Sequence, residues 1–413
     1  MKTSLWCLLT LQRMRGALAQ QVGIHLLQES HPSLKVHVCG SDGLCSDKKM
    51  SITLDADIRP LQVLEGMESC ISEEERAWNT TVCPNSQKCS EQCSLGGVKY
   101  KSVHGISTHD HGLHLKLFTH VFIRRRCFRG PCGVDAALYF TSMKADGGLS
   151  HENRAGAMYG TGYCDAQCPT SLRFIDGKAN LEGTGQTGKQ VFESMGACCP
   201  ELDLWEGNGL LSAYAAHPCV HSNMSICEGE GCTAQGGLCD HSGCAFASQR
   251  VAGNAFYGPS KTIDTRYKFT VVTQFLTSTG TAQGELVEIR QFYIQNGTVI
   301  RQQSVQPPGY VSSSDSITEK AMDQGMVLVM GLWTDEVTNT LGSIQKIPAT
   351  RKANLRRING QICPERTRTQ PFIQKHHPDA SVHFSNIRIE PINSIPVAVA
   401  DHYPVRNNEH TII

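Results

Sequence analysis

One short acidic stretch contains the side chains best suited to chemistry: Glu201, Asp203 and Glu206, interleaved with apolar residues. Because side chains alternate between faces along an extended strand, Glu201, Asp203 and Trp205 are expected on one face, with the intervening leucines in the core. Glu206 has the opposite parity, so a β-bulge after Asp203 is needed to bring both glutamates into one cleft. Two glutamates about 5 Å apart could break a glycosidic bond, one attacking the anomeric carbon while the other protonates the leaving oxygen. Asp203 could then orient Glu201 and, by like-charge repulsion, help to keep the acid protonated.

A simpler explanation of an acidic pattern of this kind is a solvated strand edge. Three acidic residues within six, however, are unfavourable to bury without a purpose. The surroundings also favour a site, because Cys198-Cys199 precede the stretch, Trp205 lies within it, and Asn208 and His217 follow it. We therefore interpret the stretch as a candidate catalytic strand.

The elements that position this strand are predicted to be further β-strands. Several segments alternate apolar and polar residues, as half-buried strands do, and no long helical pattern is found. Asn296-Gly297, between two apolar runs, is a strong signal for a two-residue hairpin turn. Gly-rich loops that carry cysteines separate the strands, which indicates a β-sandwich with long, bridged loops. The expected strands span residues 51–58, 113–122, 136–143, 267–275, 286–300, 326–333 and 381–389.

Composition narrows the class of protein. The 413 residues include 38 Lys+Arg, 38 Asp+Glu and 19 Cys. The zero net charge argues against a nucleic-acid partner, because neutralising phosphates requires an excess of Lys and Arg. So many cysteines are expected to form disulfides in an oxidising compartment, and the adjacent Cys198 and Cys199 suit two separate bridges better than one tetrahedral zinc site.

The N-terminus is consistent with secretion. Residues 1–19 combine an early lysine, an apolar run and Ala17-Leu18-Ala19 before Gln20, which is typical of a signal peptide, although residues 12–15 interrupt the apolar run. No later segment approaches the roughly 18 apolar residues of a spanning helix, so no membrane anchor is expected. Sequons compatible with glycosylation are present at Asn79, Asn223 and Asn296.

His109, His111 and His114 form a close group of possible metal ligands. Because the neighbouring sequence adds no carboxylate or thiolate at a fixed spacing, we interpret them as part of a polar loop that leads into a strand. The basic run at residues 351–357 is interpreted as solvated surface. Neither a metal nor a cofactor is predicted.

Beyond the single motif, the sequence resembles glycoside hydrolase family 7, the fungal cellulases. The stretch CCPELDLWEGN followed by HPC looks like the family's active-site strand, and HPSLKVHVC, AGAMYGTGYCDAQCP, FTVVTQF, GMVLVMGLW and HFSNIRI resemble it in the same order. The resemblance covers most of Gln20 to Pro391. It implies an all-β fold, a curved β-jelly-roll sandwich whose long disulfide-tied loops form a substrate cleft. We therefore expect one catalytic domain at residues 20–392 and no carbohydrate-binding module. The end after Pro391 is interpreted from its sequence as a poorly ordered tail, residues 393–413.

The resemblance implies a role for each residue of the candidate site. Glu201 would be the nucleophile, Asp203 its orienting partner and Glu206 the acid/base. Trp333 resembles an aromatic platform for a glucose ring, and its alternative is a core position at the end of an apolar strand. A neutral polysaccharide offers hydroxyls and apolar ring faces, which suit aromatic and amide side chains. The expected substrate-binding residues are His217, Tyr139, Asp165, Gln167, Arg250, Trp205 and Trp333.

Eight disulfide bridges are likewise implied by the resemblance. Cys7 would leave with the signal peptide, while Cys127 and Cys244 lack the partners that are usual in the family. The expected pairs are Cys39 with Cys45, Cys70 with Cys93, Cys83 with Cys89, Cys132 with Cys363, Cys164 with Cys199, Cys168 with Cys198, Cys219 with Cys239 and Cys227 with Cys232.

Three departures from the family bear on the fold and on the mode of action. A hairpin normally present near residues 118–131 is missing, which predicts unmade ladder hydrogen bonds in the sheet. The segment 308–318, which helps to roof the tunnel of processive members, is short. Tunnel tryptophans are replaced by Ile58, Pro60 and Gly342, which removes stacking platforms worth about 1–3 kcal/mol each.

These features predict a secreted, monomeric endo-β-1,4-glucanase that cuts cellulose or another β-1,4-glucan internally, with retention of configuration. An exo-acting cellobiohydrolase of the same family is the alternative, favoured by the stretch LRFIDGKANLEG. A further alternative is an inactive or β-1,3/mixed-linkage glucan-binding jelly-roll protein.

Overall fold

The structure is a computed structural model that describes most of the chain between residues 21 and 412. The described residues are 21–22, 29–40, 42, 44–64, 68–72, 77–118, 131–181, 195–248, 252–280, 284–302, 317–334, 369–392 and 410–412. The strands are β1 (Gln21–Val22), β2 (Ser33–Cys39), β3 (Cys45–Ser51), β4 (Leu61–Val63), β5 (Cys93–Leu95), β6 (Ile106–His109), β7 (Gly112–Lys116), β8 (Val134–Thr141), β9 (Phe174–Ile175), β10 (Lys178–Ala179), β11 (Met195–Cys198), β12 (Glu201–Gly207), β13 (Ser212–His217), β14 (Ser225–Glu228), β15 (Cys244–Ala247), β16 (Tyr257–Gly258), β17 (Ile263–Asp264), β18 (Thr270–Thr277), β19 (Leu286–Gln295), β20 (Thr298–Arg301), β21 (Val327–Thr334), β22 (Ser381–Ser385), β23 (Arg388–Pro391) and β24 (His410–Ile412). The helices are η1 (Ala56–Ile58), α1 (Ser86–Gln92), η2 (Ala157–Tyr159), η3 (Gly229–Cys232), α3 (Ile317–Gln324) and α5 (Gln370–His376).

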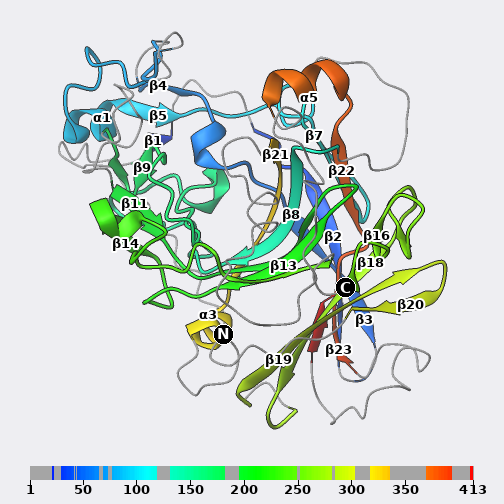
Figure 1. The fold of residues 1–413 in the computed structure, drawn as a ribbon. Coiled ribbons are helices and arrows are strands. Elements are labelled where there is room, and N and C mark those ends of the chain that lie inside the picture. The colour runs from blue at the N-terminus through cyan, green and yellow to red at the C-terminus, as the bar shows by residue number, and fades with distance from the viewer. Residues whose placement is uncertain are drawn as a thin grey trace, which may run out of the picture.

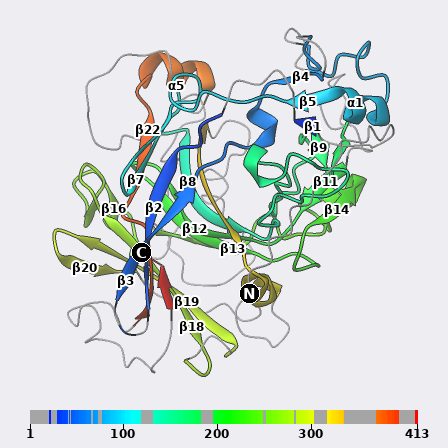
Figure 2. The same cartoon turned by 180° about the vertical axis from the view of Figure 1, so that it is seen from behind.

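Two large sheets dominate the fold. A five-stranded antiparallel sheet has the order β15-β13-β12-β8-β21, and a seven-stranded sheet has the order β20-β19-β18-β24-β23-β2-β3. Figures 1 and 2 show the long strands β8 and β13 bending along their length, while α1, β4 and β5 lie in a separate lobe. The mostly β, disulfide-rich architecture is the β-jelly-roll sandwich that the sequence predicts.

The main hydrophobic core joins the two sheets. Leu34 of β2 belongs to the same buried cluster as Ala136 of β8 and Tyr293 of β19. A second cluster joins Leu202 of β12 to Phe275 of β18. One face of β12 is thus fixed by apolar packing, and shortening a fully buried leucine such as Leu202 to alanine is expected to destabilise the fold by about 2–5 kcal/mol.

Most expected strands are present, with shifted ends. The hairpin at Asn296-Gly297 is confirmed: it joins β19 to β20, and both residues have positive φ, 52° and 74°, as a two-residue turn of the primed type requires. The expected strand at 51–58 is wrong. The observed strand β3 ends at Ser51. Asp55 then accepts a hydrogen bond from the Asp57 N–H and caps the short helix η1, so the chain does not continue as a strand.

The C-terminal end differs from the poorly ordered tail that we expected at 393–413. Residues 410–412 form β24, which lies between β18 and β23 in the seven-stranded sheet. β24 is antiparallel to both neighbours, so it supplies ladder partners in the interior of the seven-stranded sheet. The region of the missing hairpin itself lies largely outside the described residues.

Disulfides tie the loops to one another. The structure pairs Cys39 with Cys45, Cys70 with Cys93, Cys83 with Cys89, Cys164 with Cys199, Cys168 with Cys198, Cys219 with Cys239 and Cys227 with Cys232. These are the pairings that the family resemblance implies. Cys132 is also disulfide-bonded, while its expected partner Cys363, like Cys127, lies outside the described residues.

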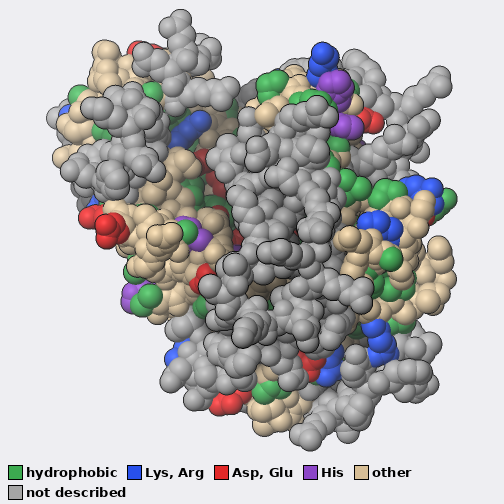
Figure 3. Space-filling model, viewed as in Figure 1, with side chains coloured by type: hydrophobic (Ala, Val, Ile, Leu, Met, Phe, Trp, Pro, Cys, Tyr) green, Lys and Arg blue, Asp and Glu red, His purple; other side chains and the backbone are tan. Residues whose placement is uncertain are grey.

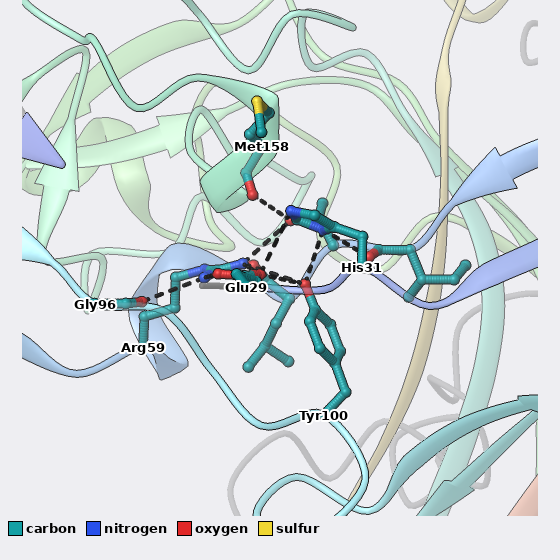
Figure 4. Close-up of polar contacts among 9 residues, drawn as sticks. Glu29, His31, Arg59, Gly96, Tyr100 and Met158 are labelled. Carbon is teal, nitrogen blue, oxygen red and sulfur yellow. Dashed lines mark hydrogen bonds and ion pairs between the residues drawn. The ribbon is translucent and has the colours of Figure 1, made fainter. Parts of the chain in front are cut away.

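A buried ion pair holds the segment before β2 against the loop after η1. The guanidinium of Arg59 donates to both carboxylate oxygens of Glu29, at 2.6 and 2.8 Å, and the Tyr100 hydroxyl donates to the same carboxylate at 2.6 Å (Figure 4). His31 Nδ1 lies 3.1 Å from that hydroxyl. We call Glu29, His31, Arg59 and Tyr100 the Arg59 cluster. The Arg59 side chain is fully buried, so this pair is structural.

The face of the molecule drawn in Figure 3 has no strong charge bias among its described residues. On the face drawn in Figure 3, acidic and basic side chains are scattered among polar and hydrophobic ones. Among the helices that the structure describes, none is long and apolar enough to cross a membrane.

Candidate active site

The candidate catalytic strand β12 contains the bulge that the sequence requires. Against β13, Glu201 pairs with His217, Asp203 with Ala215 and Glu206 with Ala213, so three steps along β12 correspond to two along its partner. The same shift occurs against β8 between Asp203 and Trp205. One extra residue in β12 therefore reverses the alternation, and Glu206 returns to the face that carries Glu201 and Asp203.

The neighbouring strands leave room above this face. The partners of Glu206 are alanines on both sides, Ala213 of β13 and Ala137 of β8, and Gly331 of β21 stands next to Ala137. Because these neighbouring side chains are small, they occupy little space above the sheet beside Glu206. Glu206 is nevertheless 7% exposed and Asp203 3% exposed, so both carboxyl groups are largely shielded from water.

His217 compensates the charge of Asp203. Its Nε2 lies 2.9 Å from Asp203 Oδ2, and its Nδ1 lies 2.9 Å from the Asp240 carbonyl, which requires a proton on Nδ1. Burial lowers the pKa of His217, but the hydrogen bond and charge of Asp203 outweigh this effect and raise it to about 10. The imidazole is therefore cationic at neutral pH and fixes the orientation of Asp203.

Asp165 adds a third carboxylate close to Glu201. It accepts a hydrogen bond from the Tyr163 hydroxyl at 2.8 Å, and that hydroxyl is 2.8 Å from the hydroxyl of Tyr139. Burial raises the pKa of Asp165 to about 6 despite the hydrogen bonds that it accepts from the Tyr163 hydroxyl and the Gln167 N–H. We call Asp165, Glu201, Asp203 and His217 the acidic cluster.

Glu201 is the most perturbed member of the acidic cluster. Its Oε2 accepts a hydrogen bond from the Ala166 N–H at 3.1 Å. Burial first, and then the charges of Asp203 and Asp165, raise the pKa of Glu201 well above its usual value. Because the pKa values of Glu201 and Asp165 are both raised, these two carboxyl groups hold protons at a pH at which isolated carboxyl groups would have lost them.

Trp205 does not belong to the polar face, contrary to the sequence expectation. The bulge that returns Glu206 to that face turns Trp205 to the opposite side, where it is 5% exposed. There its ring lies 6.3 Å from that of Phe269, within the main core. Simple alternation predicted the wrong face because the bulge falls directly before this residue.

Trp333 lies on the same face as the glutamates. In β21 it pairs with Asp135, in the alternation that also places Val329 opposite Tyr139. Its half-buried ring covers Gly331, where an added Cβ would lie 2.5 Å from the ring. This position suits the expected stacking platform next to Glu206 better than a core position.

Of the remaining expected binding residues, one lies beside the acidic cluster and one lies outside the described residues. Gln167 is exposed, and its backbone N–H donates to Asp165 Oδ1 at 2.8 Å, so it borders the acidic cluster. Arg250 lies outside the described residues. Sequence reasoning missed Tyr163, which links Tyr139 to Asp165, and the fully buried Asp135 opposite Trp333. Asp135 reaches the site through the pairing of β8 with β21, whereas Tyr163 lies in a loop that an isolated bridge between Asp165 and Cys198 holds against β11.

A pair of glutamates on one face of a bulged strand, with an aspartate beside the first, is the arrangement of a hydrolase that cleaves glycosidic bonds. The model of the family described as glycosyl hydrolase family 7 matches residues 24–128, 126–321 and 316–395. The chain belongs to this family. The matched segments meet near residues 126–128 and 316–321, close to two of the places where the sequence departs from the family pattern.

Solved structures of the family are similar over most of the chain. A cellobiohydrolase from Daphnia pulex is 30% identical, with a TM-score of 0.76 over 89% of this chain and 98% of that one. The Humicola insolens endocellulase EGI is 28% identical, with a TM-score of 0.70 over 89% and 98% of the two chains. A Melanocarpus albomyces cellobiohydrolase complexed with cellotetraose is 28% identical, with a TM-score of 0.72 over 89% and 97%.

Proposed function

We propose that the chain is a retaining cellulase that hydrolyses internal β-1,4-glucosidic bonds. The observation that carries this proposal is the bulge in β12, because it brings Glu201, Asp203 and Glu206 to one face of the sheet. The four-residue offset between His217 and Ala213 corresponds to about 13 Å along the strand. The two glutamate side chains then have to lean toward each other to reach the carboxylate spacing of about 5 Å that a retaining enzyme uses.

In the proposed reaction Glu201 attacks the anomeric carbon while Glu206 gives its proton to the departing glycosidic oxygen. Glu206 then removes a proton from water, whose oxygen attacks the same carbon and releases Glu201. Glu201 must be ionised to attack, so the proton of the acidic cluster has to reside elsewhere in the cluster at that moment. Asp165, whose pKa is raised to about 6, is the neighbouring carboxyl group that can hold it.

Two exposed residues at and just after η1 favour hydrolysis of internal bonds of the glucan over release of cellobiose from its ends. Ile58 is 58% exposed and Pro60 is exposed, so neither of these two positions offers an aromatic platform. An exo-acting cellobiohydrolase remains the second candidate, since the Daphnia pulex and Melanocarpus albomyces neighbours are named as cellobiohydrolases.

Secretion is part of the same proposal. The disulfides of the described chain require an oxidising compartment, and residues 1–19 would be the signal peptide that leads there. Asn223 and Asn296 of two sequons are exposed and accessible to glycosylation. We propose a monomer with one catalytic domain at residues 20–392.

The test compares substrates and products. We expect activity on carboxymethylcellulose with a rapid fall in viscosity, and first-formed products in the β configuration by proton NMR. Activity on laminarin alone would overturn the cellulase assignment, and α-anomers would overturn the assigned roles. Steady release of cellobiose without loss of viscosity would favour the exo-acting alternative. Binding of cello-oligosaccharides without turnover would identify an inactive protein.

A further inference from the structure

Two hairpins that are distant in sequence bring a second group of titratable side chains together. His37 of β2 lies opposite Asp47 of β3, and His37 Nδ1 is 2.8 Å from Asp47 Oδ1. His111, in the turn between β6 and β7, places its Nε2 3.6 Å from the other oxygen, Asp47 Oδ2. One carboxylate therefore lies between two imidazoles.

The turn that carries His111 is fixed by backbone contacts on both sides. The N–H of Lys35 in β2 donates to the Asp110 carbonyl at 3.1 Å, and the N–H of Asn386 donates to the His111 carbonyl at 2.8 Å. Asp110 has a left-handed φ of 44°, which an aspartate tolerates better than most side chains do. The position of the ring relative to β2 and β3 is thus set by the fold.

The chemistry of these three groups suits a divalent cation. One ligand atom from each residue lies within 4.8 Å of the others, and ligand atoms around a tetrahedral zinc ion are about 3.3 Å apart for bonds of about 2.0–2.1 Å. Two imidazole nitrogens and a carboxylate are ligands that zinc and its neighbours in the first transition series accept. All three side chains are partly exposed, 26%, 42% and 32% for His37, Asp47 and His111, so water can complete the coordination.

Nearby cations have other partners. Arg388 stands beside His37 in β23, but its guanidinium is 3.5 Å from Glu390. Lys35 is 4.0 Å from the carboxylate of Asp110. Asp47 is therefore directed at the two imidazoles. The rings of His37 and His111 are stacked, with centroids 4.3 Å apart and planes at 16°, and a bound ion requires them to be neutral and to tilt so that both lone pairs converge.

We propose that His37, Asp47 and His111 form a binding site for a divalent cation of the zinc type that joins the β2–β3 hairpin to the β6–β7 hairpin. The site is separate from the acidic cluster on β12 and takes no part in the hydrolysis. Its ion crosslinks the seven-stranded sheet to the three-stranded sheet β22-β7-β6. Because the imidazoles must lose their protons to bind, occupancy falls as the medium becomes acidic.

Zinc titration calorimetry on the full chain, untagged and treated with a chelator, tests this proposal. We expect one zinc ion per chain at pH 7.5, a rise in Tm of about 3 °C at a hundredfold excess over Kd, and at least a tenfold loss of affinity in His111→Asn and in Asp47→Asn. The matched control is His109→Asn, which removes an exposed histidine from the end of the same hairpin and is expected to bind zinc as the wild type does.

Spectroscopy separates loss of ligands from loss of folding. Cobalt substitution of the wild type is expected to give visible absorption bands of a four-coordinate ion, and both ligand variants are expected to lose them while keeping the wild-type metal-free Tm. Equal zinc affinity in the wild type and both ligand variants would overturn the proposal. So would a loss of affinity in His109→Asn as large as that in His111→Asn, since zinc would then be bound by other histidines such as His114 and His383.

Discussion

The carboxyl groups of Glu29 and Glu201 are both largely removed from water, yet their pKa values are shifted in opposite directions. In the Arg59 cluster, burial favours the protonated form, but hydrogen bonds from Arg59 and Tyr100 outweigh it and hold the pKa of Glu29 below its usual value. In the acidic cluster, burial and the charges of two neighbouring aspartates act in the same direction, and the pKa of Glu201 rises. The difference is whether a fixed cation contacts the carboxylate itself.

This contrast separates structural charge from functional charge. Both oxygens of Glu29 are bound by a guanidinium, and one also by a phenol, so the group has little capacity left for a new partner. Glu201 instead accepts a backbone N–H, from Ala166, and the imidazolium of the cluster is bound to Asp203. A buried acid whose nearest cation is bound to another carboxylate is able to take up a proton or attack carbon, and such groups mark sites of chemistry.

Glu201→Gln gives the largest expected effect. The turnover number on cello-oligosaccharides should fall by about 10⁴-fold or more, because an amide cannot form the glycosyl intermediate. The Tm at pH 7 should not fall, because the substitution removes a carboxyl group that burial and like charges disfavour. Steady-state kinetics and calorimetry on the same preparation measure both quantities. A marked fall in Tm would show that Glu201 supports the fold as Glu29 does.

Arg59→Met tests the other side of the comparison. It leaves the Glu29 carboxylate buried without its cation, and we expect a loss of about 3–5 kcal/mol in the free energy of unfolding, or a fall in Tm of about 5 °C. The kcat of the folded enzyme should change less than about threefold, because the cluster does not touch the reacting atoms. Arg266→Met is the control, since its pair with Asp264 is exposed, and its Tm should remain that of the wild type.

The two clusters should also respond differently to pH. The pKa of His217 is raised from 6.5 to about 10, so its contribution to stability is complete below pH 6.5 and is lost as the pH rises from 6.5 to about 10. The pKa of Glu29 is lowered from 4.5, so its contribution is present above pH 4.5 and is lost as the pH falls below it. Thermal unfolding across pH 3–10 measures both limbs. His217→Asn should flatten only the alkaline limb, and a variant that flattens neither would contradict the assigned cause.

Asp165→Asn should give the smallest effect. Removing one like charge lowers the pKa of Glu201, so the acidic limb of kcat/KM should move to lower pH while the rate at the plateau changes little. Tyr163→Phe, which deletes the hydroxyl that donates to Asp165, serves as the matched variant. It stabilises the charged form of Asp165 less, so Asp165 is neutral more often and the acidic limb should move in the same direction as in Asp165→Asn, but by less. Superimposable pH profiles for all three proteins would exclude electrostatic coupling between Asp165 and Glu201.

The sequence correctly predicted the strand that carries the acidic residues and the bulge within it, because the alternation of side chains along a strand is a local property. It failed at Trp205 for the same reason, since the position of the bulge within the strand depends on the register with β8 and β13. The β-sandwich followed from alternation and turn residues. The replacement of a strand by η1 depended on one local hydrogen bond that competes with the extended conformation.

Contacts between distant segments were beyond the reach of local patterns. His111 was interpreted as a loop residue because the sequence near it offers no carboxylate, whereas the fold brings Asp47 to it from another hairpin. Tyr163 and Asp135 were missed in the same way, as was the sheet position of β24. Each depends on which distant segments the fold brings together, and that arrangement is determined by the whole core.

The neighbouring Cys198 and Cys199 create a hazard during oxidative folding. Each holds a different cysteine of the loop that carries Asp165, Cys168 in one case and Cys164 in the other. Exchange of these two partners would leave every thiol oxidised and the mass unchanged, while displacing the loop from the catalytic strand. A preparation could thus contain a fully oxidised but inactive isomer of unchanged mass. Partial reduction with alkylation of the freed thiols would distinguish it from the native protein, because the two adjacent cysteines stay in one peptide on digestion. Production hosts with an active disulfide isomerase should therefore give a higher specific activity per mole of protein than hosts that only oxidise.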